Sequence, residues 1–174
     1  MQTNMLDEPL EVLTLALQGE IFALEAQQVR EILDLVPVTE VPGAQPFVDK
    51  IINVRGKVVP VADLRLKFGM EQAEDTVDTR IVVIELDIDR MSAIVGIRAD
   101  KVYEVTELAP SSLAAVPRVG MRWRPEYIRF IGKRDDDFIV VPDIARILSP
   151  NAIDLVAEQA SLDRKSASVA LAGG

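Results

Sequence analysis

The amino-acid sequence predicts a mainly β protein, built as a pair of small barrels or as a sandwich. Its 174 residues include 22 Val and 15 Ile against 17 Leu, and β-branched residues favour strands. About ten short apolar segments follow one another at close spacing, separated by turn-forming residues. A chain of this length suggests one domain, or two subdomains with a shared core, and it can fold without disulfides.

The first third of the chain predicts a hairpin followed by a short helix. Leucines alternate with other residues over 13–17, and a turn at 18–20 leads to a second apolar run at 21–24. Over residues 26–33 the apolar side chains recur at helical spacing, which predicts a short helix. Three prolines within 37–46 exclude a helix from the next stretch.

The middle third predicts two more hairpins joined by a polar loop. Residues 48–61 contain two apolar runs around a turn, in which Gly56 is free to adopt a positive φ. The alternating pattern continues as a strand over 64–68, and the acidic residues 71–79 are expected to form a loop. Residues 81–97 then predict two strands around an Asp-rich turn.

The last third predicts one further hairpin and a capped helix. An extended segment at 102–105 leads into residues 108–125, where three prolines indicate an irregular connection. Residues 127–141 predict a hairpin whose turn contains three consecutive aspartates. Asp143 is suited to cap a short helix at 144–148. No internal repeat is visible in the sequence.

The composition excludes most catalytic chemistry. The chain has no Cys and no His, so thiol nucleophiles, Ser-His-Asp triads and Cys- or His-ligated metal sites are ruled out. No phosphate-binding loop or dinucleotide motif is present, and the acidic turns lack the Gly and Glu of a calcium loop. We therefore expect no cofactor and no metal, although two carboxylates meeting in a cleft would still permit an enzyme.

The charge and hydropathy patterns point to a cytoplasmic protein. The net charge of −9 argues against long-range attraction to nucleic acid or to anionic lipid. No apolar run reaches 18 residues, and the first residues are neither basic nor continuously apolar. We therefore expect neither insertion into a membrane nor secretion.

A basic segment stands out between residues 118 and 134 of this acidic chain. Arg122, Trp123 and Arg124 lie at its centre, and Arg and Trp are enriched in protein interfaces. Arginines interleaved with aromatic residues also suit single-stranded nucleic acid. A third interpretation is a solvated loop whose tryptophan covers the end of a barrel. The sequence leaves these three alternatives open.

One central segment carries a specific motif. Residues 53–65 contain an Asn-x-Arg-Gly turn, followed after three residues by Pro-Val-x-Asp-Leu-Arg. This pattern resembles the signature of the CheW family of chemotaxis coupling proteins. The segments 28–32, 96–105 and 138–148 are also similar to the family's sequence, so the resemblance covers about residues 11–149.

The resemblance implies a fold and a domain organisation. It implies two linked, five-stranded SH3-like barrels within residues 11–149, with a boundary near 70–80 and no catalytic activity. Residues 1–10 are expected to form a flexible tail. Residues 150–174 are expected to form a helix, with Ile153 and Val156 on its apolar face, and a frayed end.

The resemblance also implies partners. Family members bridge the cytoplasmic tip of a chemoreceptor and the regulatory domain of a CheA-type histidine kinase, at the membrane periphery. On this analogy the receptor-facing residues are Val29, Arg55, Gly56 and Val95, and the kinase-facing residues are Glu31 and Ile32. The same scaffold could serve twitching motility or developmental signalling, and a small β-barrel ligand-binding module is the alternative from another class.

Several motif residues also have purely structural interpretations. Val29 and Ile32 would form the buried face of their helix, and Arg55 would be a solvated turn residue. The Asn53 amide is expected to bond the turn backbone, and Asp63 to cap or brace a turn. In addition, Pro60 is expected at a sheet edge or a bulge, since proline cannot donate to a ladder.

The sequence departs from the family pattern at a few positions. Lys50 stands where a glycine is usual, and Arg98 and Ala99 replace apolar residues before Asp100. Pro142 stands where Leu or Asn is usual. These departures leave the predicted fold intact and concern the choice of partner.

Overall fold

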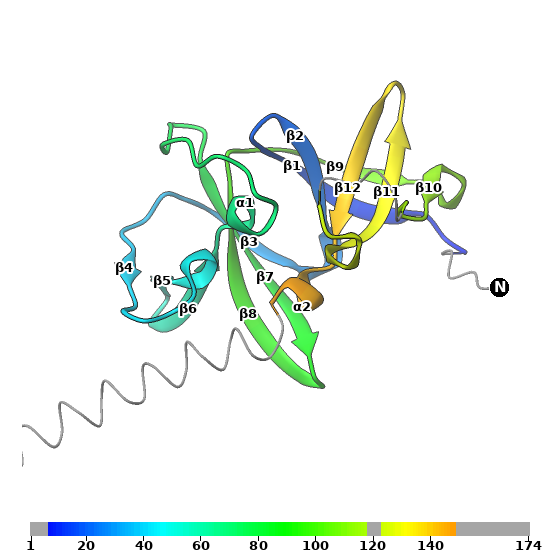
Figure 1. Cartoon of the computed structure of the whole chain (residues 1–174). Helices are drawn as coiled ribbons and strands as arrows, with labels where there is room; N and C mark the ends of the chain where they lie inside the picture. Colours follow the sequence, from blue (N-terminus) through cyan, green and yellow to red (C-terminus); the bar gives the residue numbers. More distant parts are fainter. Residues whose placement is uncertain (1–6, 118–122, 149–174) are drawn as a thin grey trace, which may run out of the picture.

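The computed structural model describes residues 7–117 and 123–148, and it contains two six-stranded sheets (Figure 1). The mainly β prediction is confirmed. The first sheet has the order β10-β11-β12-β2-β1-β9 and comprises β1 (Leu10–Leu17), β2 (Glu20–Glu25), β9 (Lys101–Leu108), β10 (Leu113–Ala114), β11 (Ile128–Arg134) and β12 (Asp137–Pro142). The second has the order β3-β7-β8-β6-β5-β4 and comprises β3 (Val29–Asp34), β4 (Thr39–Glu40), β5 (Lys50–Val54), β6 (Lys57–Ala62), β7 (Arg80–Ile88) and β8 (Met91–Ala99). Each sheet thus has five longer strands and one strand of two residues.

Helical segments are short and lie where the chain changes direction. Within residues 7–117 and 123–148, the α-helices are α1 (Leu64–Lys67) and α2 (Ile144–Ile147). The 3₁₀ helices in the same residues are Ala26–Gln28, Pro46–Val48, Pro110–Ser112 and Pro125–Tyr127. No helix in the described part of the chain is long and apolar enough to cross a membrane.

The chain passes between the sheets twice. It leaves the first sheet after β2, builds the whole second sheet from β3 to β8, and returns at Asp100 to form β9. A boundary near 70–80 therefore does not separate the two sheets, because those residues lead from α1 to β7 within the second one. β1 starts at Leu10, the last residue of the expected N-terminal tail.

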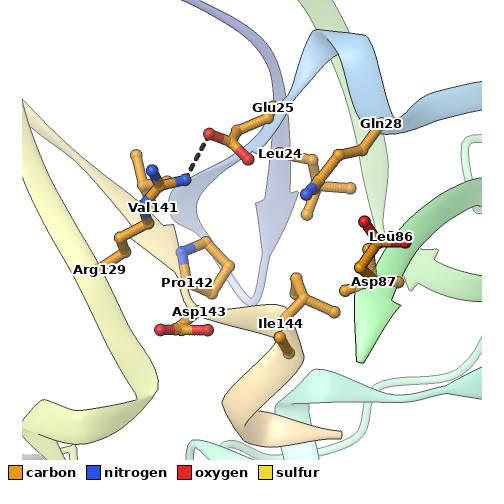
Figure 2. A pocket seen from close by; sticks show the side chains of 11 residues that line it. Leu24, Glu25, Gln28, Leu86, Asp87, Arg129, Val141, Pro142, Asp143 and Ile144 are labelled. Carbon is orange, nitrogen blue, oxygen red and sulfur yellow. Dashed lines mark hydrogen bonds and ion pairs between the residues drawn. The ribbon is translucent and has the colours of Figure 1, made fainter. Parts of the chain in front are cut away.

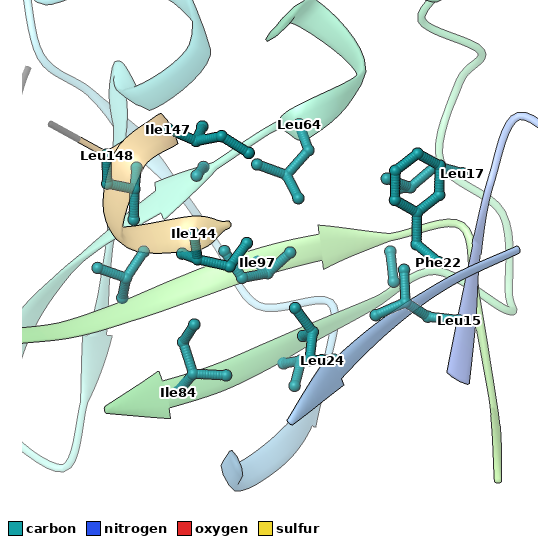
Figure 3. Close-up of a cluster of buried hydrophobic side chains, with 14 of the residues drawn as sticks. Leu15, Leu17, Phe22, Leu24, Leu64, Ile84, Ile97, Ile144, Ile147 and Leu148 are labelled. Carbon is teal, nitrogen blue, oxygen red and sulfur yellow. The ribbon is translucent and has the colours of Figure 1, made fainter. Parts of the chain in front are cut away.

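Three apolar clusters hold this arrangement together. One lies within the first sheet and includes Val12, Leu108 and Val141, and one lies within the second and includes Ile52, Val59 and Ile81. The largest cluster has 22 buried residues drawn from both sheets and both α-helices (Figure 3). Because burying a single Leu, Ile or Val side chain contributes about 1.5–3 kcal/mol, the shared cluster makes the two sheets one folding unit.

A repeated unit underlies the two sheets. Each copy runs from a 3₁₀ helix through a hairpin with a two-residue turn into a short α-helix, over 46–67 and again over 125–147. In each copy an aspartate caps the helix, and its backbone N–H donates to the 3₁₀ helix at 2.8 Å: Asp63 to the carbonyl of Phe47, and Asp143 to that of Tyr127. The structure therefore reveals a repeat that the sequence does not show.

Two predicted elements are wrong. Residues 26–33 are not a helix, because after Gln28 the chain becomes β3, whose Glu31 and Ile32 pair with strand β7. Val and Ile at helical spacing also suit a strand, and the neighbouring strand decides between the two. Residues 64–68 are not a strand, because the Asp63 side chain accepts from the Arg65 N–H and starts α1.

The structure also tests a predicted helix cap, two predicted hairpins and the expected position of Pro60. The Asp143 cap and the hairpins at both ends of the chain are confirmed. Pro60 does not lie at an edge, because β6 lies between β5 and β8. The proline is tolerated there because the ladder to β8 begins one residue later, at Val61. The expected helix over 150–174 lies outside the described residues.

Candidate partner-binding site

The first half of the motif forms a turn that presents an arginine to solvent. Arg55 and Gly56 have φ values of 52° and 85°, as the two-residue hairpin turn between β5 and β6 requires. The Asn53 side-chain oxygen accepts a hydrogen bond from the Gly56 N–H at 2.7 Å, which confirms its expected structural role. The Arg55 side chain is consequently 81% exposed.

The exposed arginine meets the strand that carries the predicted kinase-facing residues. Arg55 Nη2 lies 3.3 Å from Glu31 Oε1, and the Glu31 side chain is 23% exposed. Ile32, the next residue on edge strand β3, is 44% exposed. It cannot be the buried helix face considered above. We call Glu31, Ile32, Arg55 and Gly56 the β3 corner.

A trough runs between the two sheets beside the start of β3. One half has a volume of about 300 Å³ and is lined by β2, β11, β12, α2 and the end of β7 (Figure 2). The other half has a volume of about 320 Å³ and is lined by residues around Arg30, Glu85 and Ser92. Gln28, Leu86 and Asp87 line both halves, so the two halves adjoin, and together we call them the trough.

Ion pairs stand on both sides of the trough. Arg129 from β11 pairs with Glu25 at the end of β2, and Arg30 from β3 pairs with Glu85 from β7. The Ser92 hydroxyl also donates to Glu85, at 2.6 Å. The apolar lining comes from both sheets and from α2: Leu24, Leu86, Val141, Pro142, Ile144 and Ala145.

The second half of the motif is buried and structural. The Arg65 side chain is 4% exposed, and its Nε and Nη2 donate to the two carboxylate oxygens of Asp63 at 2.9 and 2.8 Å. Burial acts to raise the pKa of the Asp63 carboxyl. The hydrogen bonds and charge of Arg65, with a hydrogen bond from Gln72, outweigh burial and hold that pKa below its ordinary value of 3.8. The hydrogen bonds from Arg65 to Asp63 in turn raise the pKa of the Arg65 guanidinium.

The unusual Arg98 belongs to the same buried network. Its guanidinium donates to Asp75 in the 71–79 loop at 2.6 Å, and to Asp100 at 2.6 Å. Asp100 also accepts from the Gln18 N–H in the β1–β2 turn at 2.7 Å. Arg98 therefore joins the loop to the point where the chain returns to the first sheet.

The structure separates the predicted receptor-facing residues. Arg55 and Gly56 lie at the β3 corner, whereas Val29 is half-buried against the shared core, between the trough residues Gln28 and Arg30. Val95, the fourth residue predicted to face the receptor, is 2% exposed, so its side chain packs in the core and is not at the surface. Val95 lies in the central part of the second sheet, where an apolar strand packs on the shared core.

Trp123 is partly buried and packs against the shared core. Its ring centre lies 5.6 Å from that of Phe22 and 5.2 Å from that of Phe68. This is the structural alternative, in which the tryptophan covers the end of a barrel. Arg124 is exposed, with its guanidinium carbon 5.9 Å from the Tyr127 ring centre, and Arg122 lies outside the described residues.

Comparison with known proteins identifies the family. The family model of the CheW-like domain matches residues 11–151. The chain belongs to the CheW family. It is 29% identical to the chemotaxis protein CheW of Klebsiella aerogenes over 146 residues, which is 84% of this chain and 86% of that protein. It is 30% identical to CheW of Bacillus subtilis over 131 residues, covering 75% and 81% of the two chains.

A solved structure supports the same conclusion for the fold. The scaffolding protein TtCheW from Thermoanaerobacter tengcongensis superimposes with a TM-score of 0.73 at 29% sequence identity. The match covers 83% of this chain and 95% of that one. The CheW fold consists of two SH3-like β-barrel subdomains, and the two sheets described above correspond to them.

The trough is the part of the site that sequence reasoning missed. Its lining residues come from segments around positions 24–30, 85–92, 129 and 141–145, which no motif connects. Strand pairing brings them together, β3 with β7, β7 with β8, β11 with β12 and β12 with β2, along with the packing of α2 on the shared core. The single sequence signal was the Asp143 cap, which places Ile144 at the start of α2.

Proposed function

We propose that this protein is a non-catalytic adaptor of a bacterial chemosensory array. It couples the cytoplasmic tip of a chemoreceptor to the regulatory domain of a CheA-type histidine kinase, and so supports control of the kinase. Membership of the CheW family and the names of its chemotaxis relatives support this role. The protein would act in the cytoplasm, held beside the inner membrane by the receptors.

The observation that carries the proposal is the position of two candidate surfaces on one strand. The trough reaches Arg30 of β3, and the β3 corner begins at Glu31, the next residue. Backbone pairing of β3 with β7 fixes both surfaces relative to each other. An adaptor needs two partner surfaces in a defined geometry, and β3 supplies them.

The β3 corner supports the kinase contact. β3 is an edge strand, and it presents the exposed Ile32 beside the charged pair of Glu31 and Arg55. Leu35 and Val38, also exposed, follow directly in the chain. An apolar centre with charges at its rim is typical of protein interfaces, where the charges add specificity.

The trough supports the receptor contact. A receptor tip is a helical hairpin, and an amphipathic helix docks by placing its apolar residues, at i, i+3 and i+4, into an apolar groove. The trough offers the half-buried Ala145 and the edges of the largely buried Leu24, Leu86 and Ile144 for that face. Its polar rim would fix the orientation of the helix.

Titration tests the proposal directly. Isothermal titration is performed with the regulatory domain of each CheA-type kinase from the same organism, and with receptor cytoplasmic fragments. We expect saturable binding to one kinase domain and to at least one receptor fragment, and a ternary complex when all three are mixed. Absence of binding to every kinase domain would overturn the adaptor role while leaving the family assignment intact.

A further inference from the structure

The middle of the trough contains two polar side chains that are free to bind a partner. Asp87 and Gln28 line both halves of the trough on either side of Leu86. Figure 2 shows them at the same side of the cavity, with the single ion pair among the drawn residues formed by Glu25 and Arg129. Within the described residues, neither the Asp87 carboxylate nor the Gln28 amide has a side-chain partner.

The cations of the trough are already engaged. Arg129 is held by Glu25, and Arg30 is held by Glu85. The other lining carboxylate, Asp143, caps α2 by accepting from the Arg146 N–H at 3.1 Å. Among the residues that the structure describes, four carboxylates therefore face two arginines in the trough, and Asp87 is the carboxylate that no ion pair or helix cap engages.

We propose that Asp87 determines which helix the trough accepts, by pairing with a Lys or Arg beside the helix's apolar residues. This inference rests on the proposed receptor contact and adds the chemistry of the contacting helix. An apolar residue of the helix would cover Leu86, and the basic residue would reach the carboxylate next to it, one helical turn away. The Gln28 amide would accept a further hydrogen bond from that basic group or donate to a helix carbonyl.

Charge supports a basic occupant. The chain as a whole carries a net charge of −9, so a basic partner segment is attracted before contact. Asp87 is exposed in the free protein, and a helix with an acidic residue at the same position would place two carboxylates together as it covers the trough. Such like-charge contacts are strongly unfavourable, and they are how interfaces reject wrong partners.

The test uses the receptor fragment that binds the full-length protein. Asp87→Asn should weaken binding about threefold and reduce its salt dependence, and Asp87→Lys should weaken it about tenfold or more. The matched control is Asp136→Lys, which makes the same charge change on an exposed turn of the first sheet. In addition, each Lys and Arg of the fragment's tip is changed to Glu in turn.

We expect that one variant of the receptor tip no longer binds the natural protein. The same tip variant should bind again when the adaptor carries Asp87→Lys. Equal affinities for Asp87→Lys and the natural protein would overturn the inference and leave the adaptor role standing. Equal losses in Asp87→Lys and Asp136→Lys would also overturn it, because the effect would then be one of net charge. If no receptor fragment binds the natural protein, the receptor contact itself fails. Thermal unfolding of each variant shows that it is folded.

Discussion

The two copies of the repeated unit share a hairpin and a capped helix but differ in the side chains that these elements carry. In both, a two-residue hairpin turn leads to an aspartate that caps a four-residue helix. In the first copy the turn is Arg55-Gly56 and an arginine lies buried against Asp63. In the second the turn is Asp135-Asp136, and Arg146 is exposed, 3.9 Å from Asp143. The common backbone is therefore a feature of the fold, whereas the differing side chains give the first copy an arginine in its turn and a buried ion pair.

Within the first copy, two arginines ten positions apart have opposite roles. Arg55 lies in solvent with a single ion pair at 3.3 Å, and Arg65 is buried with two hydrogen bonds to one carboxylate. An exposed pair contributes about 0–1 kcal/mol, whereas removing one partner of a buried pair costs about 3–5 kcal/mol. Arg65 therefore stabilises the fold, and Arg55 is available for a partner.

The largest expected effect comes from breaking the buried pair. Arg65→Ala should lower the free energy of unfolding by about 3–5 kcal/mol, because Asp63 and Asp100 lose a buried cation. Arg146→Ala, which removes the exposed arginine one helix position later in the second copy, should cost no more than about 0.5 kcal/mol. Urea unfolding of both variants measures the difference. Similar losses in the two variants would contradict the assignment of roles.

Acid should weaken the fold through the carboxylate of the first copy, Asp63. The folded pKa of Asp63 lies below its ordinary value of 3.8, so its ionised form stabilises the fold above that pH. This contribution should be lost as the pH falls below 3.8 and through the folded pKa. Between pH 6 and about pH 2, the free energy of unfolding should therefore fall less steeply for Asp63→Asn than for the natural protein. The same pH dependence in both proteins would show that ionisation of Asp63 does not stabilise the fold.

A glycine should stabilise the hairpin turn of the first copy and have little effect on stability in the turn of the second copy. Gly56 has a φ of 85° with no atom within 4 Å of an added Cβ, so Gly56→Ala meets backbone strain without a clash. We expect a loss of about 1–2 kcal/mol. Asp135, with a φ of 55°, is a residue type that tolerates this region, and Asp135→Gly should change stability by less than about 0.5 kcal/mol. Thermal unfolding compares the two, and an unchanged midpoint for Gly56→Ala would contradict the strain.

The smallest stability change is expected at Arg55, where binding should respond instead. Arg55→Ala removes an exposed pair and should change the free energy of unfolding by less than about 0.5 kcal/mol. Kinase affinity should nevertheless weaken, because Arg55 belongs to the β3 corner, and a titration with the kinase regulatory domain measures the change. An unchanged affinity would exclude Arg55 from the kinase contact.

Local patterns predicted those parts of the fold that local interactions determine. The hairpin turns, the Asn53 bond and the Asp143 cap follow from residues next to each other in sequence. Residues 26–33 were mispredicted because the spacing of Val29 and Ile32 suits a helix as well as a strand. The choice is made by β7, about 50 positions later in the chain.

The site was predictable only where a motif covers it. The motif located Arg55, Gly56 and Asp63, but it did not distinguish the exposed Arg55 from the buried Arg65. The motif did not indicate that Val95 is buried, because burial depends on the sheet and core around β8. The trough residues, such as Asp87 and Arg129, come from separate strands and become neighbours only in the folded protein.

The central claim is that β3 carries two separable partner surfaces, and Glu31→Lys tests it most directly. The change reverses the charge at the β3 corner and leaves the trough lining unaltered. Isothermal titrations measure the affinities of this variant and of the control Asp136→Lys for the kinase regulatory domain and for the receptor fragment. The account predicts that Glu31→Lys alone loses about tenfold or more in kinase affinity and keeps its receptor affinity. An equal fall in both affinities, or no fall in either, would contradict it.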